Sequence, residues 1–450
     1  MAHWANDAVF YHIYPLGMCG APAHNDFSSP TVHRLDQLYG WLDHLQYLGI
    51  NALYLGPLFE STSHGYNTAD YYRVDRRLGD NDTLKRLVAA LHQRGIRVIL
   101  DGVFNHVGRD FWAFRDVLEH GEQSAYRDWF AGLQFGPRSP YDDPFVYEAW
   151  SGHYSLVKLN LHHPAVRDHL LQAVGLWMRE FEIDGLRLDA ADVIDLGFLR
   201  DLAAFCHDQR PDFWLMGEIV HGDYRQWAND QTLDSVTNYE CYKGLYSSHV
   251  DKNYFEIAYA LNRQFGEGGI YQHLPLYTFV DNHDVNRVAS NLTDAAHLYP
   301  LYCLLFTMPG VPSIYYGSEW GIPGKKNNGS DAPLRPMIDL DTINRNAPHP
   351  DLPQAINRLA WLRRNAATLR YGDYRQIFVA SEQFAFTRQT ADEMILVAVN
   401  AANKPAVIPL DLPLNGATQL ADLLNPGQTI PIKAQQIEIP AYWGRVLRVQ

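Results

Sequence analysis

Hydrophobic residues follow two alternating patterns over roughly the first 370 residues of the chain. Short apolar runs predict buried strands, and segments with apolar residues every three or four positions predict amphipathic helices. The predicted strands are 9–15, 51–57, 96–101, 184–189, 213–218, 234–239, 276–281 and 311–316, and the clearest predicted helices are 35–48, 83–93 and 164–181. This alternation of strand and helix is typical of an α/β fold, the (β/α)8 TIM barrel.

One connection, residues 107–159, is much longer than the others. It holds about fifty residues, whereas connections of this kind usually have about 2–6. The segment is rich in aromatic residues, glycine and proline, as in FGPRSPYDDP (135–144). We therefore expect an inserted subdomain after the third strand, with the barrel itself formed by residues 1–106 and 160–370.

Beyond residue 370 the helical pattern stops. IFVASEQFAFTRQ (377–389), MILVAVNAA (394–402) and RVLRVQ (445–450) alternate apolar and polar residues, and turns such as NPGQ (425–428) separate them. This pattern predicts a C-terminal antiparallel β-sandwich over residues 371–450.

The composition is that of a globular protein and excludes two classes of partner. Of the 450 residues, 47% are hydrophobic and 20% are charged, which allows a large core. The net charge of −14 argues against nucleic acid, whose phosphates are bound by lysine and arginine. No run of 18 apolar residues occurs, so we expect no membrane partner.

Cysteine usage and the N-terminus both favour the cytoplasm. Cys19, Cys206, Cys241 and Cys303 show no metal-ligand spacing and are expected to be reduced, partly buried thiols. The N-terminal residues lack a basic region followed by an apolar stretch, so we expect no signal peptide.

Three carboxylates carry the candidate chemistry. They are Asp189 in GLRLDA (185–190), Glu218 in LMGEI (215–219) and Asp284 in FVDNHD (279–284). Each follows strand-like residues, which places it at the carboxyl end of a barrel strand, where ligands bind. The phrase DGVFNH (101–106) brings His106 to the same rim. Two carboxylates that flank a scissile bond are the minimum for retaining glycoside hydrolysis.

Arg187 lies two residues before Asp189 on the same predicted strand, so the two side chains point to one face. A guanidinium favours the charged form of a neighbouring carboxyl, and we expect Arg187 to lower the pKa of Asp189. The alternative is a purely structural Arg–Asp pair.

Five phrases resemble the ordered signature regions of the α-amylase family of glycoside hydrolases. They are HGYNTADYY (64–72), DGVFNH, GLRLDA, GEIVH (217–221) and FVDNHD. VKLNL (157–161) is similar to the MPKLN phrase of the neopullulanase, cyclomaltodextrinase and maltogenic amylase branch. VPSIYYGSEWGIPG (311–324) resembles the last barrel strand of the family and its loop. The resemblance extends from about Val9 to about Arg370.

The resemblance implies a role for each carboxylate. Asp189 is the expected nucleophile, Glu218 the general acid and base, and Asp284 the carboxylate that binds sugar hydroxyls and stabilises the transition state. Arg187 is expected to bind at the same site.

The resemblance also implies a set of substrate-binding residues. Tyr66 is expected to stack on the sugar, with His64 close by, while His106 and His283 bind its hydroxyls. Arg287 is expected to pair with a site carboxylate.

The chain departs from the branch at several positions. It has Asn67 where the family usually has aspartate, Val193 where the branch has glutamate, and Val220 where it has tryptophan. The barrel is also expected to begin almost at once, without the N-terminal β-domain that shapes the branch's dimer. A homodimer is therefore left open.

These features predict a retaining hydrolase of short linear or cyclic maltooligosaccharides. It would cleave α-1,4 bonds, with α-1,6 bonds left open, and carry out some glycosyl transfer. An α-glucosidase or a glucanotransferase of the same fold is the alternative, because the choice of acceptor depends on the cleft past Val193. A non-catalytic amylase-like partner subunit is disfavoured, because the catalytic carboxylates are present.

The sequence predicts no cofactor and no metal ligand. Members of the family that bind calcium use the asparagine of the DGVFNH phrase, here Asn105, with acidic groups of the inserted segment. Asp142 and Asp143 are the candidates for these acidic groups. Because an oxygen-ligand site cannot be recognised from one aspartate pair, calcium is left open.

Overall fold

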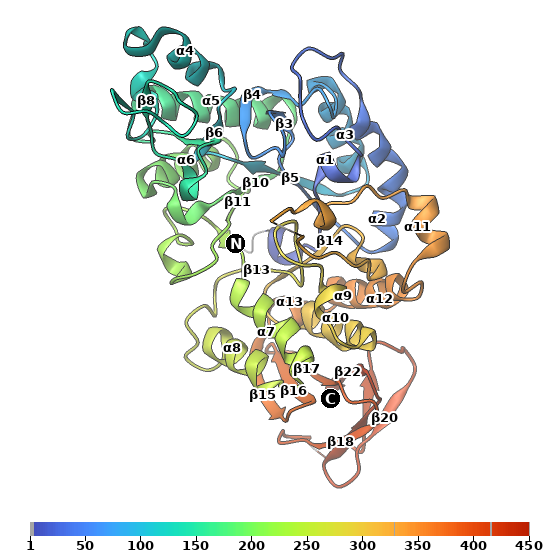
Figure 1. Ribbon diagram of the computed structural model, residues 1–450. Coiled ribbons are helices and arrows are strands. Elements are labelled where there is room, and N and C mark those ends of the chain that lie inside the picture. Colours follow the sequence, from blue (N-terminus) through green and yellow to red (C-terminus); the bar gives the residue numbers. More distant parts are fainter. Residues whose placement is uncertain (1–3, 328, 415, 450) are drawn as a thin grey trace.

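The computed structural model describes residues 4–327, 329–414 and 416–449, and its centre is an eight-stranded sheet (Figure 1). In spatial order the strands are β12 (Ser235–Val236), β11 (Trp214–Gly217), β10 (Gly185–Leu188), β5 (Arg97–Gly102), β2 (Ala52–Leu55), β1 (Phe10–Ile13), β14 (Val311–Tyr315) and β13 (Tyr277–Thr278). Neighbouring strands are parallel, and a parallel bridge between Thr237 and Tyr277 joins the two ends of the sheet. The predicted TIM barrel is confirmed.

Alternate residues of the strands fill the interior of the barrel. Phe10, Ile99 and Trp214 are fully buried and belong to one interior cluster. Because side chains two positions apart share a face of a strand, Asp101 faces the same way as Ile99. Arg187 lies opposite Asp101 in the register of β5 and β10. The barrel therefore places a charged pair above its apolar core.

Helices cover the outside of the barrel (Figure 1). They include α2 (Leu42–Tyr47), α3 (Asn81–Gln93), α5 (Pro164–Glu180), α6 (Leu196–Gln209), α7 (Tyr239–Val250), α8 (Phe255–Phe265), α10 (Leu298–Thr307) and α12 (Leu352–Asn365). Pro164 occupies the first turn of α5, where its missing N–H is harmless. The predicted helix 35–48 is instead a 3-10 helix, Arg34–Trp41, followed by α2, and the low helix propensity of Gly40 accounts for the break. Among the described residues, no helix is both long and apolar enough to cross a membrane.

The inserted segment has short elements of its own, at the upper left of Figure 1. They are β6 (His106–Gly108), α4 (Trp112–His120), β7 (Gln134–Phe135), β8 (Phe145–Val146) and β9 (Leu156–Lys158). Strands β6 and β9 pair antiparallel and so hold the two ends of the segment together. Phe114, Phe130 and Phe145 pack edge to face inside it. This packing holds the segment against the rim of the barrel.

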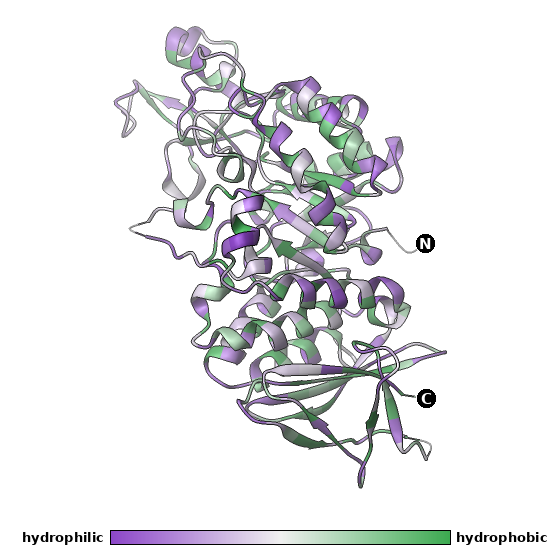
Figure 2. Cartoon of the chain, turned by 90° about the vertical axis from the view of Figure 1, so that its right-hand side faces the viewer, coloured by the Kyte–Doolittle hydropathy of each residue, from purple (hydrophilic) through white to green (hydrophobic). Residues whose placement is uncertain are grey.

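The C-terminal residues form an antiparallel sheet of six strands. Its order is β15 (Asp373–Val379), β16 (Gln383–Gln389), β17 (Met394–Asn400), β22 (Trp443–Val449), β19 (Gln419–Asp422) and β20 (Thr429–Pro431). A ribbon of β18 (Ala406–Pro409) and β21 (Gln436–Ile439) covers one face, where Ile408 and Ile437 join Leu396 and Leu447 in a second core. Figure 2 shows the hydrophobic residues along these strands. The predicted β-sandwich is confirmed.

Candidate active site

Arg187 is the centre of the site, and it is buried. One nitrogen, Nη1, lies 2.9 Å from Oδ1 of Asp101 and 3.0 Å from Oδ1 of Asp189. The other, Nη2, lies 2.6 Å from Oε2 of Glu218. A single guanidinium therefore bridges three carboxylates that come from the ends of β5, β10 and β11.

The backbone after β10 helps to position Glu218. The amide of Ala190 donates to Oε2 of Glu218 at 3.1 Å, and Ala190 has a left-handed φ of 45°. This turn aims the amide at the carboxylate and costs backbone strain, because a non-glycine residue seldom adopts it. The hydroxyl of Tyr239 donates to Oε1 at 3.3 Å. Glu218 is held on both oxygens.

Asp284 lies in the loop after β13 and is held by two cationic or polar side chains. Nε2 of His283 is 2.9 Å from its Oδ2, and Nη2 of Arg335 donates to its Oδ1 at 2.9 Å. Tyr66 connects this group to the first, because its hydroxyl donates to Asp101 at 3.1 Å and also hydrogen-bonds with His283. The two halves of the site form one network.

Burial and charge act in opposite directions on the carboxylates. Burial raises the pKa of Asp189 above its ordinary value, and Arg187 opposes this without cancelling it. We expected Arg187 to decide the direction, but the loss of water from a fully enclosed carboxyl outweighs one neighbouring cation. For Asp284 burial also acts upward, yet His283, Arg335 and Arg187 together hold the pKa well below its ordinary value.

Two histidines face the cavity in the neutral form. Burial lowers the pKa of His106 to about 3 and that of His64 to about 4. Nε2 of His106 lies 3.8 Å from Oδ2 of Asp189 and has no hydrogen-bond partner among the described residues. A neutral imidazole with an unsatisfied nitrogen beside a carboxylate can bind a hydroxyl group of a ligand.

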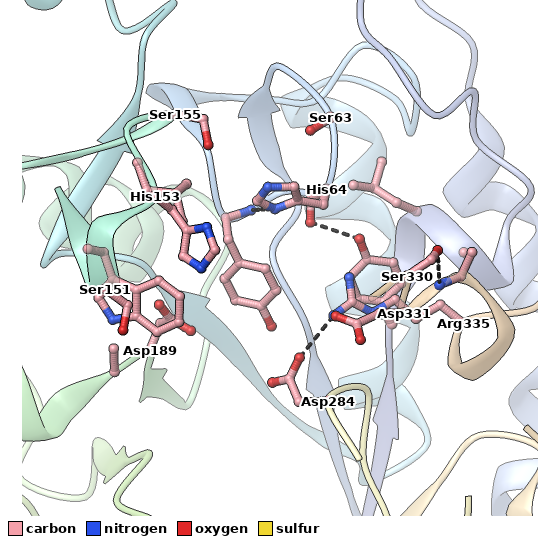
Figure 3. Close-up of a pocket in the computed structure, with 18 of the residues that line it drawn as sticks. Ser63, His64, Ser151, His153, Ser155, Asp189, Asp284, Ser330, Asp331 and Arg335 are labelled. Carbon is pink, nitrogen blue, oxygen red and sulfur yellow. Dashed lines mark hydrogen bonds and ion pairs between the residues drawn. The ribbon is translucent and has the colours of Figure 1, made fainter. Parts of the chain in front are cut away.

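These side chains line a cavity of about 1130 Å³. Figure 3 shows Asp189 and Asp284 pointing into it from different sides, with Arg335 beside Asp284. The outer wall adds residues that the sequence did not single out as site residues: Trp150 and His153 from the inserted segment, and Lys326, Asp331 and Arg335 from the loop after β14. The apolar side chains of Val193 (47% exposed) and Val220 (38% exposed) also lie there.

The predicted site residues come together with one exception. Asp189, Glu218, Asp284, His64, Tyr66 and His106 line the cavity, and Arg187 and His283 bind these residues from below. Arg287 does not: it is fully buried and donates to the carbonyls of Tyr316 and Leu334.

The expectation that Arg287 pairs with a site carboxylate is therefore wrong. Among the described residues it forms no ion pair, because its guanidinium supports the loop that carries Arg335. The arginine that binds Asp284 is Arg335, 51 residues along the chain. No signature phrase includes it. The phrase DGVFNH, by contrast, already contains Asp101, which could have been recognised as the first partner of Arg187.

In a comparison with models of known protein families, the alpha-amylase catalytic domain matches residues 33–347, which is more than half of the chain. The chain belongs to the α-amylase family. This membership, with the pocket of carboxylates, makes it a glycoside hydrolase.

Individual members of the α-amylase family are similar over nearly the whole chain. A cyclomaltodextrinase from Geobacillus thermopakistaniensis is 32% identical over 98% of this chain and 76% of that protein. The cyclic α-maltosyl-(1→6)-maltose hydrolase of Arthrobacter globiformis has a TM-score of 0.83 at 27% identity, with 100% of both chains covered. The debranching enzyme of Nostoc punctiforme has a TM-score of 0.82 at 29% identity, again with both chains fully covered.

The residues that a family calcium site would use do not fit a cation here. Both carboxylate oxygens of Asp143 bind Arg109, each at 2.8 Å, and Asp142 pairs with Arg138 at 2.7 Å. The side-chain nitrogen of Asn105 contacts His106, while its buried oxygen has no hydrogen-bond partner among the described residues. Calcium requires about six to eight oxygen ligands, and with both aspartates paired to arginines this one free oxygen does not make such a site.

Proposed function

We propose that this glycoside hydrolase cleaves α-1,4 bonds of short linear or cyclic maltooligosaccharides with retention of configuration. The observation that carries the proposal is the Arg187 guanidinium, which holds Asp189 and Glu218 next to each other at the floor of the cavity. Two carboxyl groups that share one guanidinium lie close together, and a short separation of the two groups is typical of the retaining mechanism rather than of inversion.

In the first step Glu218 gives its proton to the glycosidic oxygen while a carboxylate oxygen of Asp189 bonds to the anomeric carbon. The bond to the leaving sugar breaks, and a glycosyl–enzyme ester forms. In the second step Glu218 takes a proton from water, the water oxygen attacks the anomeric carbon, and Asp189 leaves as a carboxylate. In our proposal Asp189 reacts as the carboxylate, which Arg187 favours against the upward effect of burial on the pKa of Asp189, and Glu218 carries the proton.

The other polar groups bind the sugar that reacts. Asp284, whose low pKa keeps it ionised, accepts hydrogen bonds from sugar hydroxyls. His106 and His64 offer neutral imidazole nitrogens at the same cavity. One face of the Tyr66 ring stacks on His283, with centroids 5.4 Å apart, so a sugar would pack against its other face.

The size of the cavity and the relatives support a short glucan as the substrate. A volume of about 1130 Å³ is slightly larger than that of most small-molecule sites, which span about 300–1,000 Å³, and it suits an oligosaccharide of a few sugar units. The similar proteins include cyclomaltodextrinases and a hydrolase of cyclic α-maltosyl-(1→6)-maltose. The latter also motivates α-1,6 cleavage as an additional activity.

Initial rates on β-cyclodextrin, maltotriose, maltose, pullulan and soluble starch test the proposal. We expect β-cyclodextrin and maltotriose to be cleaved faster per site than starch, and Asp189→Asn protein to cleave none of them. A higher rate on starch than on both small substrates would show an ordinary endo-acting α-amylase. Cleavage of maltose alone would show an α-glucosidase.

Glycosyl transfer is the second candidate activity, and the exposed Val193 and Val220 favour it. Apolar side chains on the outer wall hold water less well than the polar groups on the floor, so a second sugar can compete as acceptor. Val193→Glu should raise the ratio of hydrolysis to transfer on maltotriose, whereas Val32→Glu, an exposed valine elsewhere, should not. An unchanged ratio in Val193→Glu would remove the argument.

We infer a cytoplasmic location from a relative. The intracellular maltogenic amylase of Bacillus subtilis is 30% identical over 88% of this chain. Fractionation of the native host tests it, and activity in the medium would contradict it. The homodimer left open by the sequence is tested by light scattering of the purified chain.

A further inference from the structure

A second concavity lies on the outside of the molecule, between α12 and the turn that follows β19. Its volume is about 470 Å³, within the range of about 300–1,000 Å³ of small-molecule sites. Its walls are Asn357, Arg358 and Trp361 from α12, and Leu423, Leu424, Asn425, Pro426 and Gln428 from the turn. It shares no described lining residue with the catalytic cavity.

Trp361 is the main apolar group of this concavity and is 55% exposed. Its neighbours Leu359, Ala360 and Leu362 are buried and pack α12 against the rest of the protein. Trp361 therefore lies on the outer side of the helix, and its indole is not needed for that packing. An exposed indole in a concavity of this size offers a ligand one flat apolar surface.

The opposite wall is a turn that is held in one conformation. The buried Asp422 accepts a bond from the amide of Leu424 at 2.9 Å and from the side chain of Asn425 at 3.0 Å. Arg445 pairs with the same carboxylate at 3.0 Å. The turn closes through the amide of Gln428, which donates to the carbonyl of Asn425 at 3.0 Å. Because this turn is already ordered, it loses little conformational entropy when a ligand binds, and this favours affinity.

The polar side chains of the concavity have free hydrogen-bonding capacity. Asn357 donates to the carbonyl of Tyr47 and keeps its amide oxygen free, while the described residues provide no partner for the side chains of Arg358 and Gln428. Amide groups both donate and accept, as sugar hydroxyls do. An exposed indole beside amides suits a neutral sugar, which has an apolar face and a polar edge.

We propose that this concavity, the Trp361 site, binds a glucose segment of an α-glucan. The indole of Trp361 stacks on one sugar ring, and Asn357, Gln428 and Arg358 bind hydroxyls. The identity of the ligand rests on the proposed function, because the enzyme's own substrate is the neutral oligosaccharide at hand.

The position of the site gives it a separate role from catalysis. Barrel helices run opposite to the strands, so Trp361, in the second half of α12, lies toward the end of the barrel away from the catalytic cavity. A short substrate cannot occupy both sites. An oligosaccharide bound at Trp361 is instead kept near the enzyme, which raises its effective concentration at the cavity.

Fluorine NMR of protein labelled with 5-fluorotryptophan tests the site directly. The chain has 11 tryptophans, and Trp361→Phe identifies the signal of Trp361 while Trp150→Phe identifies that of Trp150 in the catalytic cavity. Maltoheptaose is titrated into Asp189→Asn protein, so that no hydrolysis occurs. We expect both signals to move, each with its own concentration dependence.

Two variants define the chemistry. Gln428→Ala, which leaves the turn's backbone bond intact, should weaken the Trp361 titration by about threefold or more, as expected for loss of one hydrogen-bonding group. Tyr259→Ala removes an aromatic that is 69% exposed elsewhere and should change neither titration. Equal titrations of Trp361 in Gln428→Ala and the parent would contradict the proposed contacts.

The outcomes separate this proposal from the proposed function. A Trp361 signal that stays unmoved while that of Trp150 moves overturns the Trp361 site alone. A Trp361 signal that moves without Trp150 supports the site and counts against the proposed function, and no movement of either signal overturns both. If the Trp361 signal shifts with protein concentration in the absence of sugar, this surface binds a second copy of the chain. That result would overturn the proposal.

Discussion

The floor and the outer wall of the catalytic cavity are built in different ways. On the floor, Asp101, Asp189 and Glu218 follow three adjacent barrel strands and share one guanidinium, Arg187. On the outer wall, Trp150, Val193 and Lys326 lie in loops, and no sheet register relates them to one another. Strand register fixes the groups that do chemistry, whereas loop conformation decides which substrate reaches them.

The difference shows in the interactions. The floor residues are buried and bonded on several atoms, so a change in one disturbs the others. The wall residues are more exposed and have fewer partners, so changes there should alter specificity with little effect on the fold. Each prediction below tests one side of this comparison.

The largest effect is expected for Asp189→Asn. The swap is nearly isosteric but removes the nucleophilic oxygen, so activity should fall by at least about a hundredfold, the scale for residues that act as a unit. Initial rates on maltotriose measure it. Asp192→Asn is the matched control. Asp192 lines the same cavity and lies three residues after the nucleophile, but its side chain is exposed. Residual activity above about a hundredth would remove Asp189 from its role.

A smaller loss is expected for Arg335→Ala. Arg335 binds Asp284 at 2.9 Å and the carbonyl of His283 at 3.0 Å, so its loss should misplace the third carboxylate. We expect kcat/KM to fall by about tenfold to a hundredfold, which corresponds to the loss of one hydrogen bond between charged groups, about 1.5–3 kcal/mol. Lys326→Ala removes the outer end of the same network, since among the described residues its ammonium group pairs with Asp331 alone. Equal effects of the two substitutions would mean that Arg335 stabilises the loop and does not position Asp284.

Stability should decrease on acidification, because the folded protein keeps histidines neutral. Burial lowers the pKa of His106 to about 3 and of His64 to about 4, from an ordinary 6.5. The unfolded chain takes up these protons as the pH falls through 6.5, so the folded state loses stability between pH 6.5 and about 4. The raised pKa of Asp189 acts in the opposite direction, whereas burial also lowers the pKa of His169 to about 4 and that of His249 to about 3.

Scanning calorimetry at pH 7 and pH 5 checks this expectation. Two histidines of this kind cost roughly 3–4 kcal/mol between these pH values, and a chain of 450 residues loses about 1 °C of melting temperature per kcal/mol, so the melting temperature should fall by roughly 3–4 °C. His64→Gln should reduce the decrease, and His162→Ala, whose side chain is 80% exposed, should leave it unchanged. A melting temperature that rises toward pH 5 would contradict the assignment.

The smallest effect is expected on removal of calcium. Because Arg109 occupies both oxygens of Asp143, treatment with a chelator should leave activity and melting temperature unchanged. A loss that added Ca²⁺ restores would show a site elsewhere.

Much of the fold could be predicted from the sequence. The eight strands, the inserted segment and the C-terminal sheet leave clear periodicities, and Pro164 marks a helix start. The helix 35–48 was predicted less well, because a glycine inside an otherwise periodic segment lowers helix propensity without abolishing the pattern. The strands β12 and β13 are also shorter than predicted, since the chain leaves the sheet early to form the site loops.

The candidate site was predictable where it follows strands and not where it depends on loops. Asp189, Glu218 and Arg187 are related by strand register, which the sequence pattern encodes. Arg335 binds Asp284 from a loop that lies 51 residues further along the chain, and no local sequence pattern predicts such a contact. Arg287 was assigned in its place because it is nearer in sequence.

The most direct test of the account is the configuration of the first product. Proton NMR during hydrolysis of β-cyclodextrin or maltotriose resolves the anomeric signal before mutarotation. Since Arg187 holds Asp189 and Glu218 together for a two-step displacement, the α-anomer should form first. A β-anomer as the first product would show direct attack by water and would contradict the assignment of Asp189 as nucleophile.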